Sequence, residues 1–269
     1  MSQEAPESEQ GRDLLDSPEL LGIEPGSPEW FEIQRKFILS RPLVRSTYDQ
    51  WYRAMLADVA SVPLERPGDI LEIGSGSGYV KTINPTVITS DIVEGHSDRV
   101  VDAQALPFSN ESLRGILLTH VFHHIPDVRR FLSEAERTLV PGGVISMIDV
   151  CHTPLARLLF GRFHPEGYDS SAREWALDSS QAMAGANQAL TWIVLRRDRE
   201  LFVKEWPMFA LECCELLPWL GYAMSGGVTR RDLVPRGAVK LISVLDKIAT
   251  IANPLCALHW HIRIRKLAQ

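Results

Sequence analysis

A glycine-rich run is the most informative chemical feature of this sequence. The run Glu72-Ile-Gly-Ser-Gly-Ser-Gly78 directly follows a short apolar segment. Glycines without a Cβ allow a sharp turn and a close approach of the backbone to a ligand. The dinucleotide fingerprint G-x-G-x-x-G would need a glycine at position 79, where Tyr79 stands. The run therefore departs from the dinucleotide fingerprint. It also carries Glu72 two residues before its first glycine, where a carboxylate can accept hydrogen bonds from a cationic ligand.

Two adjacent histidines, His123 and His124, follow another apolar segment. The unperturbed pKa of a histidine, about 6.5, lies close to neutrality, so either side chain could serve as a general base. Packing and hydrogen bonding beside a cleft is the competing interpretation. Adjacent side chains diverge along an element and no third ligand is evident, so we predict no metal site.

Apolar segments alternate with turns and an amphipathic helix through the middle of the chain. We expect strands at 69–73, 86–90, 99–101, 115–119 and 144–148, and a helix at 127–139 that ends at Pro141-Gly-Gly143. This alternation predicts a parallel, doubly wound sheet. Ligands of such sheets bind at the carboxyl ends of the strands.

The flanking regions complete the expected organisation. We predict a disordered acidic tail at 1–18, a helical cap at 19–66 broken near Pro42, a ligand-binding core at 67–152, and a substrate-side insertion with the last strands at 153–269. Within the last region we expect strands at 191–195 and 209–216 and a helix at 239–251. The strict alternation of 258–265 predicts a terminal antiparallel edge strand that is covered on one side.

The ordered motifs resemble those of class I S-adenosylmethionine-dependent methyltransferases with a methyltransferase type 11-like domain. The segment ILEIGSGSGYV resembles the first motif of the family. Asp91 ends the second strand, where the family carries an acid that accepts both ribose hydroxyls. Asp102-Ala103 looks like the adenine-edge segment. His120 to Asp127 resembles the segment that lines the methyl-transfer cleft, and Leu139 to Val144 the turn into strand five.

The resemblance implies a Rossmann-like, doubly wound, seven-stranded α/β sheet with an N-terminal helical cap and a C-terminal insertion. It implies S-adenosyl-L-methionine as cofactor, bound by Glu72, Gly74, Ser75, Gly76, Gly78, Asp91, Ile92, Asp102, Ala103 and His120. On the same grounds His124 and His123 are the catalytic candidates. Asn187, Trp192 and Tyr48 are the substrate-side candidates.

The expected function is methyl transfer to a small molecule, a sugar or a secondary metabolite in a biosynthetic pathway, with oxygen as the favoured nucleophile. Two alternatives stay open at this point. A nicotinamide-dependent oxidoreductase would need the glycine spacing that is missing here. A catalytically idle methyltransferase-like scaffold would not need the acidic and glycine positions that are present.

Charge and composition limit the partners. The net charge of −6 over 269 residues argues against nucleic-acid binding. Residues 228–269 hold eight Lys/Arg and two Asp, a net charge of +6, so the rest of the chain carries −12. This basic region could make peripheral contact with a membrane or meet a phosphate-bearing substrate, or could be solvated surface. No apolar run is long enough to span a membrane, and no secretory signal is evident. We therefore expect a cytoplasmic protein whose four cysteines are reduced. The sequence leaves the oligomeric state open.

Overall fold

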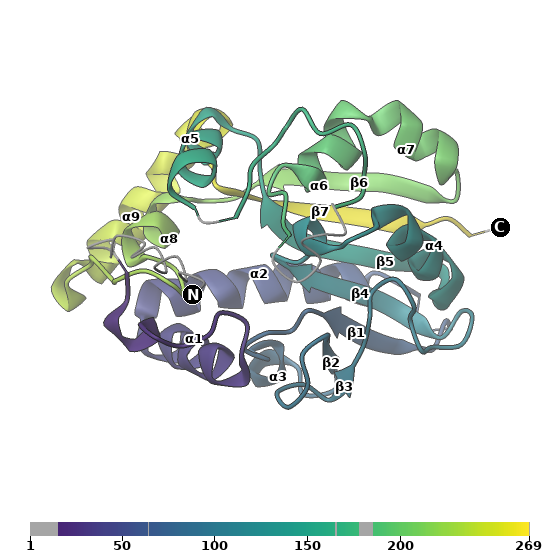
Figure 1. Cartoon of the computed structure of the whole chain (residues 1–269), viewed down its shortest axis with the longest axis horizontal. Helices are drawn as coiled ribbons and strands as arrows, with labels where there is room; N and C mark the ends of the chain where they lie inside the picture. Colours follow the sequence, from purple (N-terminus) through teal and green to yellow (C-terminus); the bar gives the residue numbers. More distant parts are fainter. Residues whose placement is uncertain (1–15, 64, 165, 178–184, 269) are drawn as a thin grey trace, which may run out of the picture.

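A seven-stranded sheet in the order β3-β2-β1-β4-β5-β7-β6 forms the centre of the computed structural model, which describes residues 16–63, 65–164, 166–177 and 185–268 (Figure 1). The strands are β1 Asp69–Ile73, β2 Ile88–Asp91, β3 Arg99–Val100, β4 Leu113–Thr119, β5 Leu139–Val150, β6 Phe209–Leu216 and β7 His259–Lys266. Strands β1 to β5 pair in parallel, whereas β7 is antiparallel to both β5 and β6. The predicted doubly wound sheet is confirmed. Most of the predicted acidic tail, residues 1–15, lies outside the described residues.

Strand β7 corrects one prediction. The strict alternation of 258–265 predicted an edge strand covered on one side, but β7 lies between β5 and β6. The prediction is wrong because β6 pairs with its second side, with Leu216 opposite Trp260. His259 and His261, which the alternation placed on the open face, are buried because Trp51 and Asp58 pack against that face.

Two helices precede the sheet, α1 Pro28–Ser40 and α2 Pro42–Ala60. Ser27 caps α1 by accepting a hydrogen bond from the backbone N–H of Trp30 at 3.2 Å. Arg41 is extended because the residue before a proline avoids the helical region, so the helix breaks at Pro42 as predicted. Helix α2 lies along one face of the sheet and buries Met55 and Val59 in the same cluster as Leu117 and Val144.

Helix α4 Val128–Thr138 covers the other face. Asp127 caps it and accepts from the backbone N–H groups of Arg129 and Arg130. The predicted stop at Pro141-Gly-Gly143 is wrong in detail, since the helix ends at Thr138 and these residues lie inside β5. They form an irregularity there: Leu139 pairs with Leu113, and the next pair is Gly115 with Val144.

In the predicted C-terminal insertion, the helices formed by 154–163, 220–225 and 239–249 lie toward the carboxyl ends of the parallel strands, whereas the helix at 199–205 lies at the opposite end of the sheet (Figure 1). The helices of this insertion are α5 Pro154–Phe163, α6 Leu190–Trp192, the π-helical turn Ile193–Arg197, α7 Arg199–Glu205, α8 Leu220–Ser225, α9 Val239–Ala249 and α10 Asn253–Cys256. The strand predicted at 191–195 is wrong, because this segment is helical. Its residues Thr191, Ile193, Val194 and Leu195 are all buried, and an apolar run that short has the same pattern in a buried helix as in a strand.

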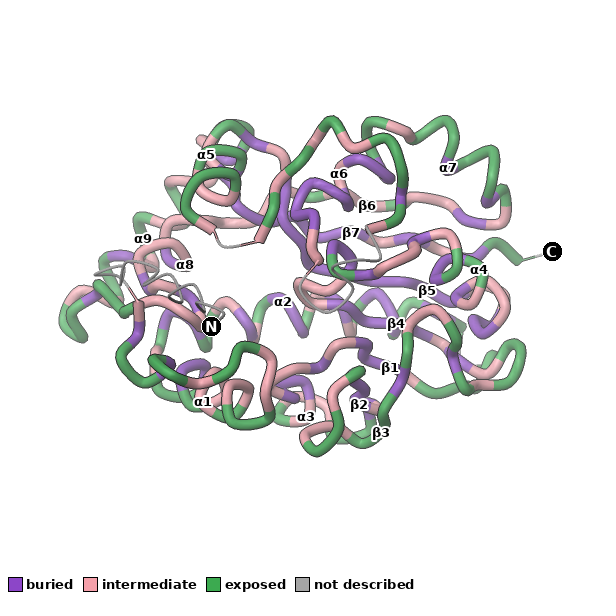
Figure 2. The backbone as a smooth tube through the Cα atoms, in the orientation of Figure 1, coloured by how far each residue is buried: buried purple, intermediate pink, exposed green. Residues whose placement is uncertain are grey.

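Short helical turns complete the chain: η1 Pro18–Leu20, α3 Val80–Ile83, η2 Phe122–His124, η5 Arg236–Ala238 and η6 Thr250–Ala252. Buried backbone runs through the strands and the inner sides of the helices, with exposed segments outside (Figure 2). The main apolar cluster joins residues of the predicted core to residues of the predicted insertion, such as Met147 to Leu190. The division into cap, core and insertion stays a prediction. Among the described residues no helix has the length and apolarity to cross a bilayer.

Candidate active site

The glycine run forms a tight loop between β1 and the end of β2. Gly74 has φ +61°, and a Cβ there would lie 2.4 Å from Cγ2 of Val121, so this position requires glycine. The backbone N–H of Gly76 donates to Oδ2 of Asp91 at 3.1 Å. Ser75 links the same two strands, since its hydroxyl accepts from the backbone N–H of Ser90 and donates to the carbonyl of Glu72. The sequence-predicted loop and acid therefore lie together.

Glu72 lies fully buried beneath this loop. The hydroxyl of Tyr52, on α2, donates to its Oε1 at 2.6 Å. Its Oε2 has no hydrogen-bond partner among the described residues. Burial raises the pKa of Glu72 to about 7. A buried carboxylate with a free oxygen fits a cationic ligand group, because such a group would supply both the hydrogen bond and the missing charge.

Helix α1 covers the outer side of the loop. Nη1 of Arg35 donates to the carbonyls of Ser77 and Gly78, both at 3.1 Å. The ring of Phe31 lies 4.5 Å from that of His96, whose Nε2 is 3.2 Å from Oδ2 of Asp91. Asp91, the acid predicted to bind the ribose, therefore already has two neighbours. The backbone N–H of Gly76 donates a hydrogen bond to it, and His96 lies beside it where a ligand could displace it.

The residues predicted beside the adenine lie at the open side of this region. Ile92 is exposed and Ala103 is half-buried. Asp102 is exposed, and its Oδ1 accepts from the backbone N–H of Gln104 at 2.8 Å. The side-chain amide of Gln104 also donates to Oδ1 at 3.2 Å and to Oδ2 at 3.5 Å. The contact of Asp102 with an exocyclic amine stays a prediction.

His120 occupies a strained position at the end of β4. Its φ of +58° lies in the left-handed region, which non-glycine residues rarely adopt outside functional or tightly constrained sites. Its Nε2 is buried without a hydrogen-bond partner, and its ring meets that of His259 edge-on at 4.6 Å. Burial lowers the pKa of His120 to about 4, so the imidazole is neutral at pH 7.

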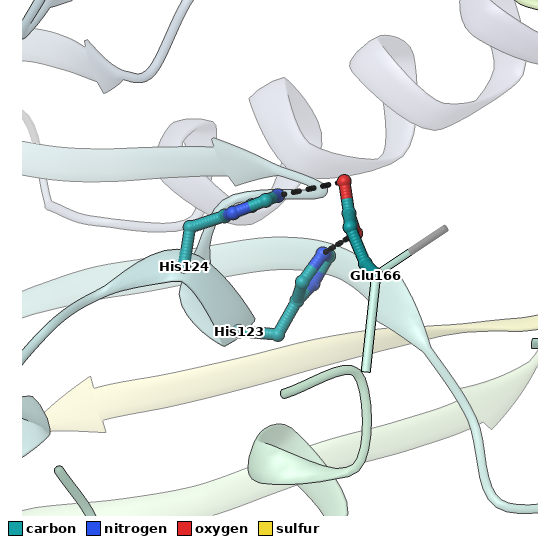
Figure 3. Close-up of side chains that lie close together, drawn as sticks. All are labelled: His123, His124 and Glu166. Atoms are coloured by element: carbon teal, nitrogen blue, oxygen red, sulfur yellow. Dashed lines mark ion pairs between the residues drawn. The ribbon is translucent and has the colours of Figure 1, made fainter. Parts of the chain in front are cut away.

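The two predicted catalytic histidines face a carboxylate from the insertion. Nε2 of His123 lies 3.4 Å from Oε2 of Glu166, and Nε2 of His124 lies 3.5 Å from Oε1 of the same residue (Figure 3). Gln188 donates from Nε2 to Oε2 of Glu166 at 2.5 Å. On its other side His123 approaches Oδ1 of Asp149, at the end of β5, with its Nδ1 at 2.5 Å.

This arrangement of charges gives the two histidines opposite protonation states at neutral pH. Burial alone would lower the pKa of His123, but Asp149 and Glu166 favour its cation and raise the pKa to about 10. Desolvation and the neighbouring His123 cation lower the pKa of His124 to about 4. At neutral pH a cationic His123 therefore bridges two carboxylates, while His124 is neutral, exposed and able to accept a proton.

The sequence analysis missed Asp149 and Glu166. A signal for Asp149 exists, because it is the one acid in the otherwise apolar end of the segment Val144-Ile-Ser-Met-Ile-Asp-Val150. Nothing in the sequence marks Glu166, which lies in a loop 42 residues beyond His124 and meets the histidines only through the fold.

The same cluster has a donor set that could hold a metal. The ligand atoms of His123, His124 and Glu166 all lie within 4.8 Å of one another. Two imidazoles and one carboxylate are a set that zinc and iron accept. The argument against a metal assumed that a third ligand was missing, and Glu166 supplies one. The absence of a metal therefore stays a prediction.

The three substrate-side candidates lie apart from one another in the structure. The side-chain amide of Asn187 stabilises the loop at Asp169. Its Nδ2 donates to the backbone carbonyl of Asp169 at 2.9 Å, and its Oδ1 accepts from the backbone N–H of Asp169 at 3.0 Å. Trp192 stacks on His152 with ring centroids 3.8 Å apart. Tyr48 is buried in an aromatic cluster on α2. Asn187 reaches the histidines through its backbone N–H, which donates to the carbonyl of His123. Their substrate roles stay predictions.

Comparison with known families agrees with the family resemblance of the sequence motifs. The family model of the methyltransferase domain matches residues 45–201, more than half of the chain. The chain belongs to this methyltransferase family. It is a class I methyltransferase with S-adenosylmethionine as its cofactor, and the nicotinamide alternative is set aside.

Solved structures with similar folds are distant in sequence. An S-adenosylmethionine-dependent methyltransferase from Thermotoga maritima is 18% identical, with 88% of this chain and 99% of that chain covered and a TM-score of 0.45. One from Mesorhizobium loti is 14% identical, with 78% and 96% covered and a TM-score of 0.44. The geranyl diphosphate C-methyltransferase of Streptomyces coelicolor is 12% identical, with 81% and 77% covered and a TM-score of 0.45. No curated protein matches the chain.

Proposed function

We propose that this methyltransferase methylates a hydroxyl oxygen of a small molecule, a sugar or a secondary metabolite in a biosynthetic pathway. The observation that carries the proposal is the exposed, neutral His124, whose Nε2 lies 3.5 Å from the carboxylate of Glu166. A neutral hydroxyl must lose its proton during methyl transfer, whereas a neutral amine can attack with its lone pair first. A proton acceptor at the end of β4 therefore favours oxygen.

The cofactor would be held at the carboxyl ends of β1 and β2. Glu72 would receive the cationic methionine group on its free Oε2, and Asp91 would accept from the ribose hydroxyls. The glycine loop with Ser75 would shape the cavity, and Ile92, Asp102 and Ala103 would line the adenine. His120 would border the methyl group. Bound S-adenosylmethionine supplies a methyl group already activated by its sulfonium.

The chain's own chemistry would be alignment and proton transfer. The cofactor would supply the methyl group for the acceptor oxygen, and Nε2 of His124 would take up the proton that the hydroxyl loses. The carboxylate of Glu166 stabilises the imidazolium that forms. His123 acts as a positioning residue, because its contacts with Asp149 and Glu166 fix the carboxylate opposite His124.

A labelled-methyl experiment tests this proposal. The enzyme is incubated with a cell extract and S-adenosylmethionine carrying a ¹³C methyl group, and labelled products are identified by mass spectrometry and NMR. We expect an O-methyl product with the wild type, and less of it with Asp91→Ala when the cofactor concentration is near the dissociation constant of the wild type. An N-methyl, C-methyl or S-methyl product would contradict oxygen as the acceptor. The absence of any labelled product, from enzyme that binds the cofactor, would favour the idle scaffold.

A further inference from the structure

The basic C-terminal region divides into a paired part and an unpaired part. Arg263 contacts Asp58 at 2.7 Å, Arg265 contacts Glu212 at 2.7 Å, and Lys266 lies 3.7 Å from Glu111. The charges of these strand residues are therefore paired with carboxylates of the same chain. In contrast Arg236, Lys240 and Lys247 have no carboxylate within 4.0 Å among the residues that the structure describes.

Helix α9 carries these unpaired lysines and also an exposed apolar face. Leu241, Val244 and Ile248 are 60%, 56% and 58% exposed. At about 100° per residue they lie within roughly 60° of one another around the helix. Ile251 and Leu255 extend the apolar surface into the following turns. We call the surface formed by 241, 244, 248, 251 and 255 the α9 face.

The α9 face is not the side by which the helix packs. Ile242 is buried beside Leu43 and Val234, and it lies about 160° around the helix from Val244. Asp246 also points inward, since its Oδ1 accepts from the backbone N–H of Leu220 at 2.8 Å. The helix is therefore apolar on two sides, and its outer side has no partner within the described chain.

We propose that the α9 face docks this methyltransferase onto an anionic lipid bilayer. From 233 to 256 the exposed charged side chains are all basic, namely Arg236, Lys240 and Lys247, and the single carboxylate of that segment is the inward Asp246. A helix that presents an apolar face flanked by lysines binds in the headgroup region of such membranes. The rest of the chain is acidic, so the same field orients this end toward the lipid.

A second copy of the chain fits this surface less well. A two-fold interface places the same patch on both sides, so each lysine would approach the basic residues of the other copy. No acidic side chain on the α9 face would compensate that repulsion. The charge pattern therefore selects anionic lipid over self-association.

Docking would bring the carboxyl ends of the parallel strands, where the candidate active site lies, close to the bilayer. Helix α10 leads directly into β7, whose first residue His259 pairs with Val150 at the carboxyl end of β5. Helix α10 also packs against α5, which follows β5. An acceptor held at a lipid surface would thus reach the enzyme from the docked side. Lipid docking itself is independent of the proposed acceptor and can be measured without cofactor.

Vesicle sedimentation with the full chain tests the proposal. We expect the protein to sediment with vesicles that contain phosphatidylglycerol, to bind pure phosphatidylcholine vesicles more weakly, and to be released as salt rises. Val244→Asp/Ile248→Asp should lower the partition coefficient at least about tenfold. Lys240→Glu/Lys247→Glu should abolish the preference for anionic vesicles.

Matched variants on α7 serve as controls. Val203→Asp and Lys204→Glu change a valine and a lysine that are also exposed, on another surface, and they should bind vesicles like the wild type. Thermal melting confirms that each variant is folded. Binding that is absent from the wild type, or equal in the α9 and α7 variants, would overturn the proposal. A dimer in analytical ultracentrifugation that Val244→Asp/Ile248→Asp dissociates, without vesicle binding, would overturn it in favour of a second copy.

Discussion

Nδ1 of His123 lies 2.5 Å from Oδ1 of Asp149, so a buried ion pair joins the turn after β4 to the end of β5. Thr191 donates to the other oxygen of Asp149 at 2.7 Å, which ties the insertion to the same point. The pair fixes His123 on the sheet, and through Glu166 it sets the surroundings of His124. The two adjacent histidines consequently have different roles.

His124→Ala should remove proton transfer without damaging the fold. We expect turnover to fall about 10²–10⁴-fold while the dissociation constant of S-adenosylmethionine barely changes, because His124 is exposed and its side chain faces Glu166. Turnover and calorimetric affinity, measured once an acceptor is known, check this. Lys204→Ala, at an exposed position of α7, is a control outside the site. A variant that keeps most of its turnover would show that His124 only packs in the site.

The same assay decides whether the cluster works with a metal. We expect a wild-type enzyme dialysed against a chelator to retain its rate. A rate that the chelator abolishes and added zinc restores would instead assign His123, His124 and Glu166 as metal ligands.

His123→Ala should mainly cost stability. It leaves Asp149 as an uncompensated buried charge, and breaking a buried pair in this way costs about 3–5 kcal/mol. Urea unfolding should show this loss, and His124→Ala measured beside it should lose much less. His123→Ala should also lower kcat more than it changes KM, because Glu166 loses its positioning contact. Equal stability of the two variants would contradict the assigned roles.

The pH–rate profile should be flat through neutrality. The pKa of His124 is lowered to about 4, so its base form is complete above about pH 5 and is lost only as the pH falls through 4. At saturating cofactor and acceptor, kcat of the wild type should therefore be constant from pH 6 to 9 within about twofold. A histidine base with its ordinary pKa would instead give a limb near pH 6.5. A limb near pH 6.5 that disappears in His124→Ala would contradict the lowered pKa.

Glu72 should make the free enzyme less stable as the pH rises. Its pKa is about 7 in the fold against 4.5 for the ordinary value, so the folded state binds the proton more tightly than the unfolded chain. The tighter proton binding of folded Glu72 adds most to the free energy of unfolding below pH 4.5. This stabilisation, in total about 3 kcal/mol, is lost as the pH rises to about 7.

Glu72→Gln keeps an acceptor for Tyr52 but cannot ionise. The melting temperature of the wild type, relative to this variant, should therefore fall between pH 5 and 8 in the absence of cofactor. A constant difference between the two proteins over this range would mean that Glu72 ionises normally in the fold.

The glycine loop and Asp91 could be placed from sequence because each marks the end of a strand. Those strands can be recognised from short runs of apolar residues next to them in the sequence. Parallel pairing then brings the ends of β1 and β2 together. Glu166 could not be placed, because its distance from His124 depends on how the whole insertion folds back.

Strand β7 and the segment at 191–195 show two further limits. Alternation reports which residues differ in polarity, but it does not reveal that β6 covers the second edge of β7. The buried run Thr191 to Leu195 has no polar face to mark its period, so helix and strand look alike in sequence. Tertiary packing determined both outcomes.

Isothermal titration calorimetry of the wild type and Asp91→Ala with S-adenosylhomocysteine and S-adenosylmethionine tests the central claim most directly. We expect one site per chain for both ligands. Asp91→Ala removes charge-assisted hydrogen bonds worth about 1.5–3 kcal/mol each, so the dissociation constant should rise at least about tenfold with the fold intact. Folded wild-type protein that gives no heat with either ligand, or an Asp91→Ala variant that binds as tightly as the wild type, would contradict a cofactor site at the glycine loop.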